Sequence, residues 1–438
     1  MFKKLSRAAL GAAVPHGKGT AGMKTVDMPV ASKIVLSMQQ HIGAPCVPVV
    51  KKGDSVMVGS LVGKAQGFVG ADIYSGVSGT VTGIESIQYP NGAKVDAVVI
   101  ETDGLQTVDL AVQKPQVTDY QSFIAAVQKC GLVGLGGAGF PTAVKLSPKN
   151  LDAVDSLVIN GAECEPYLTA DNREFLENSD TVLKGIKAVM QYLNIATCYI
   201  GIERNKPEAM DLMFSLTKDD PSIKVVPLPS RYPQGAEKVL IERTTGREVP
   251  RGGLPSDVGV IVLNVTTVST IGKFLETGMP LTTKRMTVEG DAVAKPQNVN
   301  VIIGTPLKDV LEFCGGTKGS AAKVITGGPM MGSAQVSLDF PVLKQNNGLL
   351  VLSEKMAHLP APQPCIRCGR CISACPMGLS PVEIAGAYNK KDTDSLDAMM
   401  VDLCIACGTC TFVCPAKRPV SQTMALAKDY LKRKGGSK

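Results

Sequence analysis

CIRCGRCISACP (residues 365–376) returns as CIACGTCTFVCP (residues 404–415) near the end of the 438-residue chain. Both strings follow the pattern C-x2-C-x2-C-x3-C-P, which is the cysteine spacing of proteins that carry two [4Fe–4S] clusters. The short steps let three thiolates of one loop reach three iron atoms, and the proline turns the chain after the fourth cysteine. The strings therefore predict a C-terminal domain built around two [4Fe–4S] clusters.

The two strings are expected to exchange their fourth ligands. In two-cluster ferredoxins the fourth cysteine of each string serves the other cluster. We expect one cluster on Cys365, Cys368, Cys371 and Cys414, and the other on Cys404, Cys407, Cys410 and Cys375. Disulfides would need an oxidising compartment, and zinc sites usually pair only two C-x2-C units. The pattern thus favours a protein that moves single electrons.

The composition points to a cytoplasmic protein with about three domains. The formal net charge of +7 is modest, and its densest patch is the tail Lys428–Lys438. We expect a solvated tail, with contact to anionic lipid or to an acidic partner as the alternative, and no nucleic-acid partner. No apolar run approaches the roughly 20 residues that span a bilayer. Residues 1–28 are interpreted as an N-terminal extension and not as a signal peptide.

The remaining sequence predicts a multidomain α/β and α+β chain. Residues 29–104 are short β segments between glycines, as in the barrel-sandwich of lipoyl and biotinyl domains, but the expected hairpin tip has no lysine. Residues 118–275 alternate helices and strands, which is typical of a Rossmann-like parallel sheet covered by helices. Residues 280–345 predict a small β-grasp domain. After a proline-rich linker, residues 352–438 predict a mainly helical, ferredoxin-like cluster domain with the basic tail.

A glycine loop in the central domain predicts a ligand site. GLGGAG at 134–139 satisfies G-x-G-x-x-G, but a helix and a turn precede it, so the standard dinucleotide fingerprint is not met. The loop offers backbone that a flat ring and a phosphate can approach; a purely structural turn is the alternative. NGAECEP at 160–166 follows a predicted strand, and polar groups there lie at the usual ligand edge of a parallel sheet.

Three segments resemble a known family. GLGGAGFPTAVKL, NGAECEP and RYPQGAEKVLI resemble the flavin- and NADH-binding segments in the flavoprotein subunit of respiratory complex I. With a barrel-sandwich in front and two cluster strings behind, residues 29–420 are more similar to the RnfC (RsxC) proteins of the Rnf complex, an ion-translocating NAD:ferredoxin oxidoreductase. QQHIGAP, at 39–45, also resembles that family.

The resemblance implies that the central domain binds FMN and NAD(H). Glycines would approach the rings, an aromatic side chain would stack, a lysine would reach a phosphate, and strand-end polar groups would hold the flavin edge or a ribose. The implied residues are Gly134, Gly136, Gly137, Gly139, Phe140, Lys145, Asn160, Glu163, Glu165, Gly235, Glu237 and Asn264. Four departures from the family pattern weaken the FMN expectation more than the NAD(H) one, and they are Leu135, Ala162, Tyr167 and Ala236.

The resemblance further implies a peripheral subunit on the cytoplasmic face of the cell membrane. It would pass electrons between NAD(H), FMN and two [4Fe–4S] clusters, with membrane and iron–sulfur subunits of the Rnf complex as partners and ferredoxin as an indirect one. Hydride transfer to a flavin requires no side-chain acid or base, so no catalytic residue is expected. Two alternatives stay open: a soluble flavin–iron–sulfur reductase, such as a microcompartment cobalamin reductase, and an electron-relay or scaffold subunit whose nucleotide site is vestigial.

Overall fold

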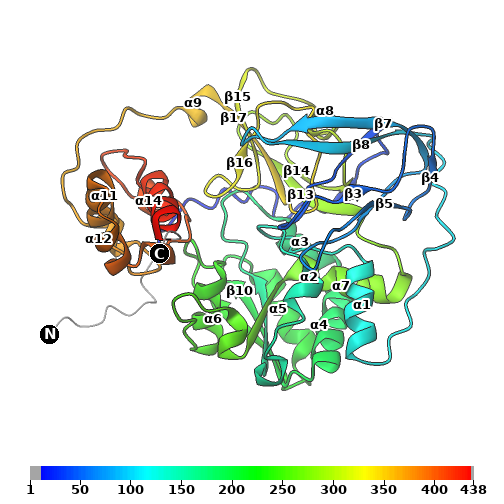
Figure 1. Cartoon of the computed structure of the whole chain (residues 1–438), viewed down its shortest axis with the longest axis horizontal. Helices are drawn as coiled ribbons and strands as arrows, with labels where there is room; N and C mark the ends of the chain where they lie inside the picture. The colour runs from blue at the N-terminus through cyan, green and yellow to red at the C-terminus, as the bar shows by residue number, and fades with distance from the viewer. Residues whose placement is uncertain (1–10, 436–438) are drawn as a thin grey trace.

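The computed structural model describes residues 11–435 and divides them among four domains. Two β-rich domains lie side by side above an α/β domain, and a small helical domain stands to one side at the end of a long connection (Figure 1). The predicted fold class is confirmed for each of the four parts.

The first domain is the predicted barrel-sandwich. One sheet has the order β2-β8-β7-β4, and a smaller sheet has the order β3-β5-β6. The strands are β2 (Lys33–Ser37), β3 (Val47–Pro48), β4 (Ser55–Val56), β5 (Leu61–Lys64), β6 (Ile73–Tyr74), β7 (Gly79–Gln88) and β8 (Lys94–Thr102). Burial alternates at the start of β7, which is typical of a strand with one face on the core.

The α/β domain has a four-stranded parallel sheet in the order β11-β10-β9-β12. Its strands are β9 (Ser156–Gly161), β10 (Thr197–Glu203), β11 (Ile223–Leu228) and β12 (Val260–Asn264). Its helices are α1 (Tyr120–Lys129), α2 (Thr142–Lys145), α3 (Ala170–Glu177), α4 (Ser179–Leu193), α5 (Pro207–Thr217), α6 (Glu237–Thr245) and α7 (Val265–Thr277), with short 3-10 turns at Leu151–Ala153 and Pro255–Val258. Since β9 has β10 on one side and β12 on the other, the strand order reverses at β9, where ligands bind in open α/β sheets.

The β-grasp domain has a six-stranded sheet in the order β1-β14-β13-β17-β15-β16. Its elements are β1 (Val26–Asp27), β13 (Thr283–Glu289), β14 (Gln297–Ile302), α8 (Leu307–Phe313), β15 (Ala321–Thr326), β16 (Ser333–Ala334) and β17 (Gly348–Ser353). β17 runs between β13 and β15, so the sheet extends past the predicted end of this domain at residue 345. β1 comes from the segment that the sequence presented only as an extension.

The cluster domain is mainly helical, as predicted. Its elements are α10 (Arg370–Ser373), α11 (Pro381–Lys390), α12 (Thr393–Ala398), a 3-10 turn at Val401–Leu403, α13 (Thr409–Phe412) and α14 (Val420–Gly435). α9 (Glu354–Ala357) precedes an extended linker, in which residues 359–368 are all exposed. Arg251 of the α/β domain forms ion pairs with Asp397 and Asp402 of the cluster domain, which connect the two domains. Within residues 11–435, no helix is long and apolar enough to cross a membrane.

Residues 11–28, which we call the N-terminal strap, join three domains. Gly11 donates its amide to the Ala374 carbonyl of the cluster domain (3.2 Å), and the His16 carbonyl accepts from the Tyr167 amide of the α/β domain (2.8 Å). β1 then pairs with β14 of the β-grasp sheet. The strap is therefore an integral part of the folded chain.

Candidate functional site

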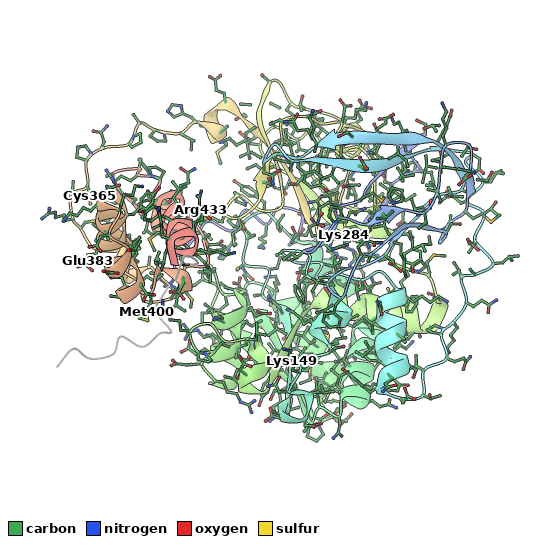
Figure 2. The ribbon with its side chains drawn as sticks, in the orientation of Figure 1. Lys149, Lys284, Cys365, Glu383, Met400 and Arg433 are labelled. Atoms are coloured by element: carbon green, nitrogen blue, oxygen red, sulfur yellow. The ribbon has the colours of Figure 1, made fainter. Side chains whose placement is uncertain are left out.

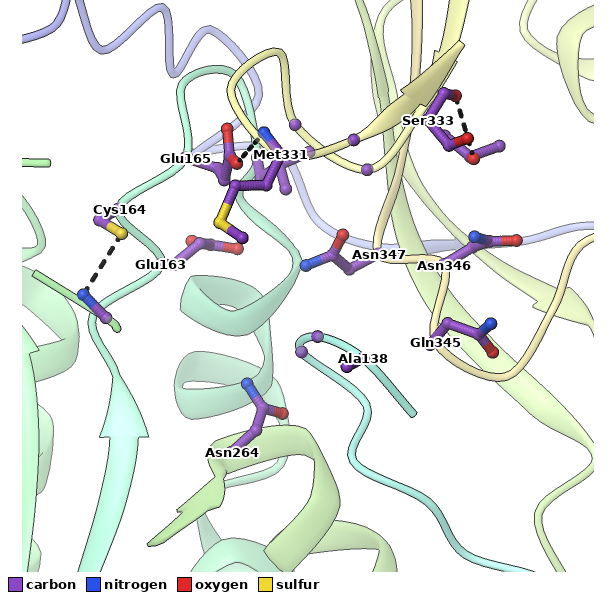
Figure 3. Close-up of a pocket in the computed structure, with 18 of the residues that line it drawn as sticks. Ala138, Glu163, Cys164, Glu165, Asn264, Met331, Ser333, Gln345, Asn346 and Asn347 are labelled. Carbon is purple, nitrogen blue, oxygen red and sulfur yellow. Dashed lines mark hydrogen bonds between the residues drawn. The ribbon is translucent and has the colours of Figure 1, made fainter. Parts of the chain in front are cut away.

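A cavity of about 530 Å³ opens where the α/β domain meets the β-grasp domain. This volume is within the ordinary range for small-molecule and cofactor sites. Figure 3 shows the arrangement: the glycine loop with Ala138 lies on one side, the strand-end residues Glu163 to Glu165 on another, and β-grasp loops with Met331 and Gln345 on the third. Seven of the predicted cofactor residues line it, and they are Gly136, Gly137, Asn160, Glu163, Glu165, Gly235 and Asn264.

The glycine loop is held by hydrogen bonds of Leu135 with Thr267 and Lys284, and two of its glycines face the cavity without side chains. Thr267 accepts from the Leu135 amide through Oγ1 (3.0 Å), and the Lys284 ammonium donates to the Leu135 carbonyl (2.8 Å). A Cβ on Gly136 would lie 2.5 Å from Asn264 Nδ2, and this clash requires glycine at residue 136. A Cβ on Gly137 would meet nothing within 4 Å. The loop thus presents unhindered backbone to the cavity, as a flat ring system requires.

The ends of β9 and β12 place two asparagines side by side, since Asn160 and Asn264 are register partners. Asn160 donates through Nδ2 to the Gly235 carbonyl (2.8 Å) and thereby holds the loop before α6. Asn264 caps α7 by accepting from the Thr266 amide (2.9 Å) and donates to Asp171 (2.7 Å). Both predicted ligand residues therefore also fix the loops around the cavity.

The two glutamates of NGAECEP have backbone partners of their own. Glu163 accepts from the Asp171 amide at the start of α3 (2.7 Å), and Glu165 accepts from the amides of Met330 (3.0 Å) and Met331 (2.8 Å). Burial raises the pKa of both carboxyl groups. Each glutamate joins two segments that are distant in sequence at the cavity wall.

The loop TGGPMMG, at residues 326–332, forms the opposite wall, and the sequence analysis missed it. A Cβ on Gly328 would lie 2.3 Å from a carboxylate oxygen of Glu165, so a glycine is required where the loop crosses that side chain. Two glycines followed by methionines before a short strand were the only sequence signal for this loop, and that pattern alone is weak.

Five predicted residues lie away from the cavity lining: Gly134, Gly139, Phe140, Lys145 and Glu237. Lys145 donates to Glu237 (2.7 Å) and to the Val262 carbonyl (3.1 Å), which leaves it paired within the α/β domain. Gly139, at φ +71°, accepts from the Ile42 amide of the QQHIGAP segment (3.1 Å). The barrel-sandwich domain thus braces the glycine loop.

Four lysines hold the loops of the site through backbone carbonyls, three of them buried and Lys18 partly buried, and sequence analysis singled out none of them. Lys284, labelled in Figure 2 where the domains meet, binds the glycine loop, and Lys344 binds the Gly131 carbonyl (2.7 Å). Lys18 of the strap donates to the carbonyls of Glu163, Glu165 and Leu168, and Lys206 donates to that of Ala162. Burial lowers the pKa of Lys18, Lys284 and Lys344 to about 8.

The departures from the family pattern have structural explanations in three cases. The Leu135 side chain is buried, and the cation that binds the loop at this residue is Lys284 below it. Ala162 is fully buried against Gly235, which leaves no room for a longer side chain. Tyr167 occupies a left-handed conformation (φ +70°) that ordinarily favours glycine, and its ring packs on Gly17 of the strap. Ala236 lines the cavity, and nothing in its surroundings accounts for the missing carboxylate.

The cysteine strings form two separate four-cysteine pockets. One is lined by Cys375, Cys404, Cys407 and Cys410, and the other by Cys365, Cys368, Cys371 and Cys414. Each pocket takes three cysteines from one string and the fourth from the other. In residues 11–435, no group of three or more His, Cys, Asp or Glu is placed to hold a single metal ion. The donor set of each pocket, four cysteines, fits a [4Fe–4S] cluster, whose thiolates bind different iron atoms.

One tyrosine joins the cavity to the first of these pockets. Tyr232 lines the cavity, is 1% exposed, and donates its hydroxyl to the Cys407 carbonyl (2.7 Å). Cys164 and Met330 pack into the same apolar cluster as Tyr232 and Cys407. The Cys404-containing pocket is therefore the one adjacent to the cavity.

Comparison with known proteins agrees with this division of the chain. Sequence models of four domains match: the RnfC barrel sandwich hybrid domain at 7–105, the Nuo51 FMN-binding domain at 127–273, the SLBB domain at 285–334 and the 4Fe-4S dicluster domain at 364–418.

Two curated relatives extend over most of the chain. The C subunit of the proton-translocating ferredoxin:NAD(+) oxidoreductase complex of Clostridium ljungdahlii is 45% identical, over 83% of this chain and 80% of the relative. The C subunit of the Na(+)-translocating complex of Acetobacterium woodii is 42% identical, over 85% and 87%. The chain belongs to the RnfC family. The family resemblance inferred from the sequence is thus confirmed, and the chain is a subunit of an oxidoreductase complex.

A solved structure shares the fold. The crystal structure of an NAD+-reducing [NiFe]-hydrogenase in the air-oxidised state matches with a TM-score of 0.50 and 17% identity, over 72% of this chain. The match covers 63% of the hydrogenase chain, just under two thirds of its length. At this identity the likeness concerns the fold alone.

Proposed function

We propose that this RnfC family member exchanges electrons between NAD(H), bound with FMN in the cavity, and two [4Fe–4S] clusters in the four-cysteine pockets. A flavin accepts a hydride and passes on single electrons, and iron–sulfur clusters carry one electron each. The observation that carries the proposal is the shared wall: Tyr232 lines the cavity and binds the Cys407 carbonyl, so the two redox sites are neighbours.

The proposal gives the chain's residues distinct roles. Gly136 and Gly137 would let the flavin and nicotinamide rings lie against bare backbone. Asn160 and Asn264, at the carboxyl ends of β9 and β12, would border the rings and keep the loops in place. Glu163 and Glu165 would complete the cavity wall, because Glu163 accepts from the Asp171 amide and Glu165 accepts from the amides of the TGGPMMG loop. The remaining predicted contacts stay predictions, and they are those of Gly134, Gly139, Phe140, Lys145, Gly235 and Glu237.

The place in the complex is also part of the proposal. We place the chain at the cytoplasmic face of the membrane, with membrane and iron–sulfur subunits of the complex as partners and ferredoxin as an indirect one. The names of the relatives support membership of an ion-translocating assembly, and they differ in the ion, which is a proton in one and sodium in the other.

The test is an anaerobic titration of the full chain reconstituted with iron, sulfide and FMN. NADH should bleach the flavin absorbance and then the cluster absorbance. Bleaching by dithionite but not by NADH would overturn the proposal and favour the relay with a vestigial nucleotide site.

Two glycine variants sharpen the test. In Gly137→Val the side chain projects into the cavity, and FMN binding should fall about tenfold or more, which corresponds to about 1.4 kcal/mol. Gly83→Val, in β7 where a Cβ likewise meets nothing within 4 Å, is the matched control and should bind FMN normally.

A further inference from the structure

The two cysteine pockets differ sharply in charge. No charged residue lines the pocket of Cys375 and Cys404 in the described part of the chain. The pocket of Cys365 and Cys414, by contrast, has three guanidinium groups on its lining, from Arg367, Arg370 and Arg418, and no acidic residue among the described residues that line it.

The three arginines are available to an outside partner. Arg367 and Arg370 are exposed and Arg418 is partly exposed, and none of the three has an acidic partner among residues 11–435. The other arginines of this region are paired differently: Arg251 holds Asp397 and Asp402, and Arg433 holds Asp429. Three unpaired cations around one redox pocket form a positive patch, which we call the arginine rim.

The pockets also differ in exposure. Cys365 and Cys368 are exposed, whereas Cys375, Cys407 and Cys410 are buried. Figure 2 shows Cys365 on the side of the cluster domain that is turned away from the other three domains. Ile366 (69% exposed) and Ile372 (40% exposed) add apolar surface between the arginines. Apolar side chains set among arginines are typical of the centre of a protein–protein interface.

We propose that the Cys365-containing cluster is the exchange point of this chain with a partner redox protein, whose acidic surface docks on the arginine rim. Cys365, Cys368, Cys371 and Cys414 would hold the cluster, which would exchange one electron with the partner's cluster or flavin, so that one would be oxidised as the other is reduced, with no proton or bond transferred. A lipid surface would also attract the rim but cannot accept or supply an electron. The inference rests on the proposed function for electron transfer between the cavity and the Cys404-containing cluster.

The rim has a second consequence, for the two reduction potentials. Reduction makes a cluster with four thiolate ligands more negative, so nearby cations and solvent favour the reduced form. Beside the other pocket the structure places one ammonium, that of Lys428, which donates to the Cys404 carbonyl (2.8 Å). With three cations on its lining and greater exposure, the Cys365-containing cluster should therefore have the higher potential of the two. That order lets an electron leaving the cavity move outward to the rim.

The experiment uses the full reconstituted chain and a pre-reduced, acidic plant-type ferredoxin as the probe partner, followed by stopped-flow absorbance. The electron-transfer rate at low ionic strength should fall roughly tenfold in Arg367→Gln/Arg370→Gln/Arg418→Gln, and wild type should lose the same factor as salt is raised. Lys432→Gln/Arg433→Gln/Lys434→Gln removes the same charge from the end of α14 and is the matched control; its rate should stay that of wild type.

A potentiometric titration followed by EPR supplies a readout that does not depend on turnover. The arginine triple variant should show a lowered potential for one cluster and an unchanged potential for the other, at full iron content. Equal rates and equal salt dependence in wild type and the rim variant would overturn the proposal, as would equal losses in the α14 control. Binding of phosphatidylserine vesicles through the rim without any effect on ferredoxin would likewise overturn it. Bleaching by NADH, measured on the same samples, shows separately whether the proposed function holds.

Discussion

The proposed exchange of the fourth ligands can be tested by counting iron in cysteine variants. Cys375 belongs to the first string, yet it lines the pocket of Cys407 and is only 9% exposed. Cys375→Ala should therefore remove one ligand from the cluster of the second string. Wild type should contain about eight iron atoms per chain and the variant about four, because the Cys365-containing cluster keeps all of its ligands.

Double variants make the count decisive, because losses within one cluster are not additive. Cys375→Ala/Cys407→Ala removes two ligands from one pocket, so about four iron atoms should remain. Cys375→Ala/Cys371→Ala damages both pockets, so almost no iron should remain. If each string served its own cluster, these two results would be reversed.

The assay is iron and sulfide analysis after anaerobic reconstitution, with EPR of the dithionite-reduced protein. A damaged cluster that keeps three irons would give a [3Fe–4S] signal before reduction, and its iron count would be about seven. Cys414→Ala is the mirror control and should spare the buried cluster. Four irons retained in Cys375→Ala/Cys371→Ala would refute the exchange of ligands.

Three other substitutions test contacts of residues in and around the cavity wall. Tyr232→Phe leaves the buried Cys407 carbonyl without its donor, at a cost of about 1–3 kcal/mol, so the thermal unfolding midpoint of the full chain should fall, and an unchanged midpoint would contradict the contact. Gly136→Ala forces its new Cβ onto Asn264, so it should lower both the thermal midpoint and FMN affinity, whereas an unchanged midpoint would contradict the close contact. Lys344 is buried with its pKa lowered to about 8, so between that pH and about 10.5 the unfolded chain binds a proton that the folded chain lacks. Stability should therefore gain up to about 1.4 kcal/mol per pH unit from this lysine as pH rises through that window. Lys344→Met should remove that slope from the pH dependence of the unfolding midpoint, and an unaltered slope would show that Lys344 does not titrate there.

Several features of the site could be predicted from patterns between residues that are close in sequence. The cysteine spacing predicted the two ligand sets, because ligands of one cluster that come from one loop must be close in sequence. The alternation of helices and strands predicted a parallel sheet, and the end of its first strand predicted a ligand edge at NGAECEP. Asn264 came only from the family resemblance, and the structure pairs it with Asn160. Such features depend on local periodicity, which a sequence displays directly.

Other parts of the site depend on contacts between distant segments. Lys18 binds the Glu163 carbonyl across 145 residues, and Tyr232 binds the Cys407 carbonyl across 175. The strap therefore looked like an extension, and the TGGPMMG loop was missed. Neither segment has a periodicity of its own, since each gains its structure from the domains that it touches.

The sequence by itself determined that the chain carries two four-iron clusters and a glycine loop at the edge of a parallel sheet. Only the tertiary structure decided which cluster adjoins the cavity and which faces solvent with the arginine rim. The physical reason is that ligand spacing is local and survives in the sequence. Burial and net charge around a cluster, in contrast, are set by whichever surfaces the folded domains bring together.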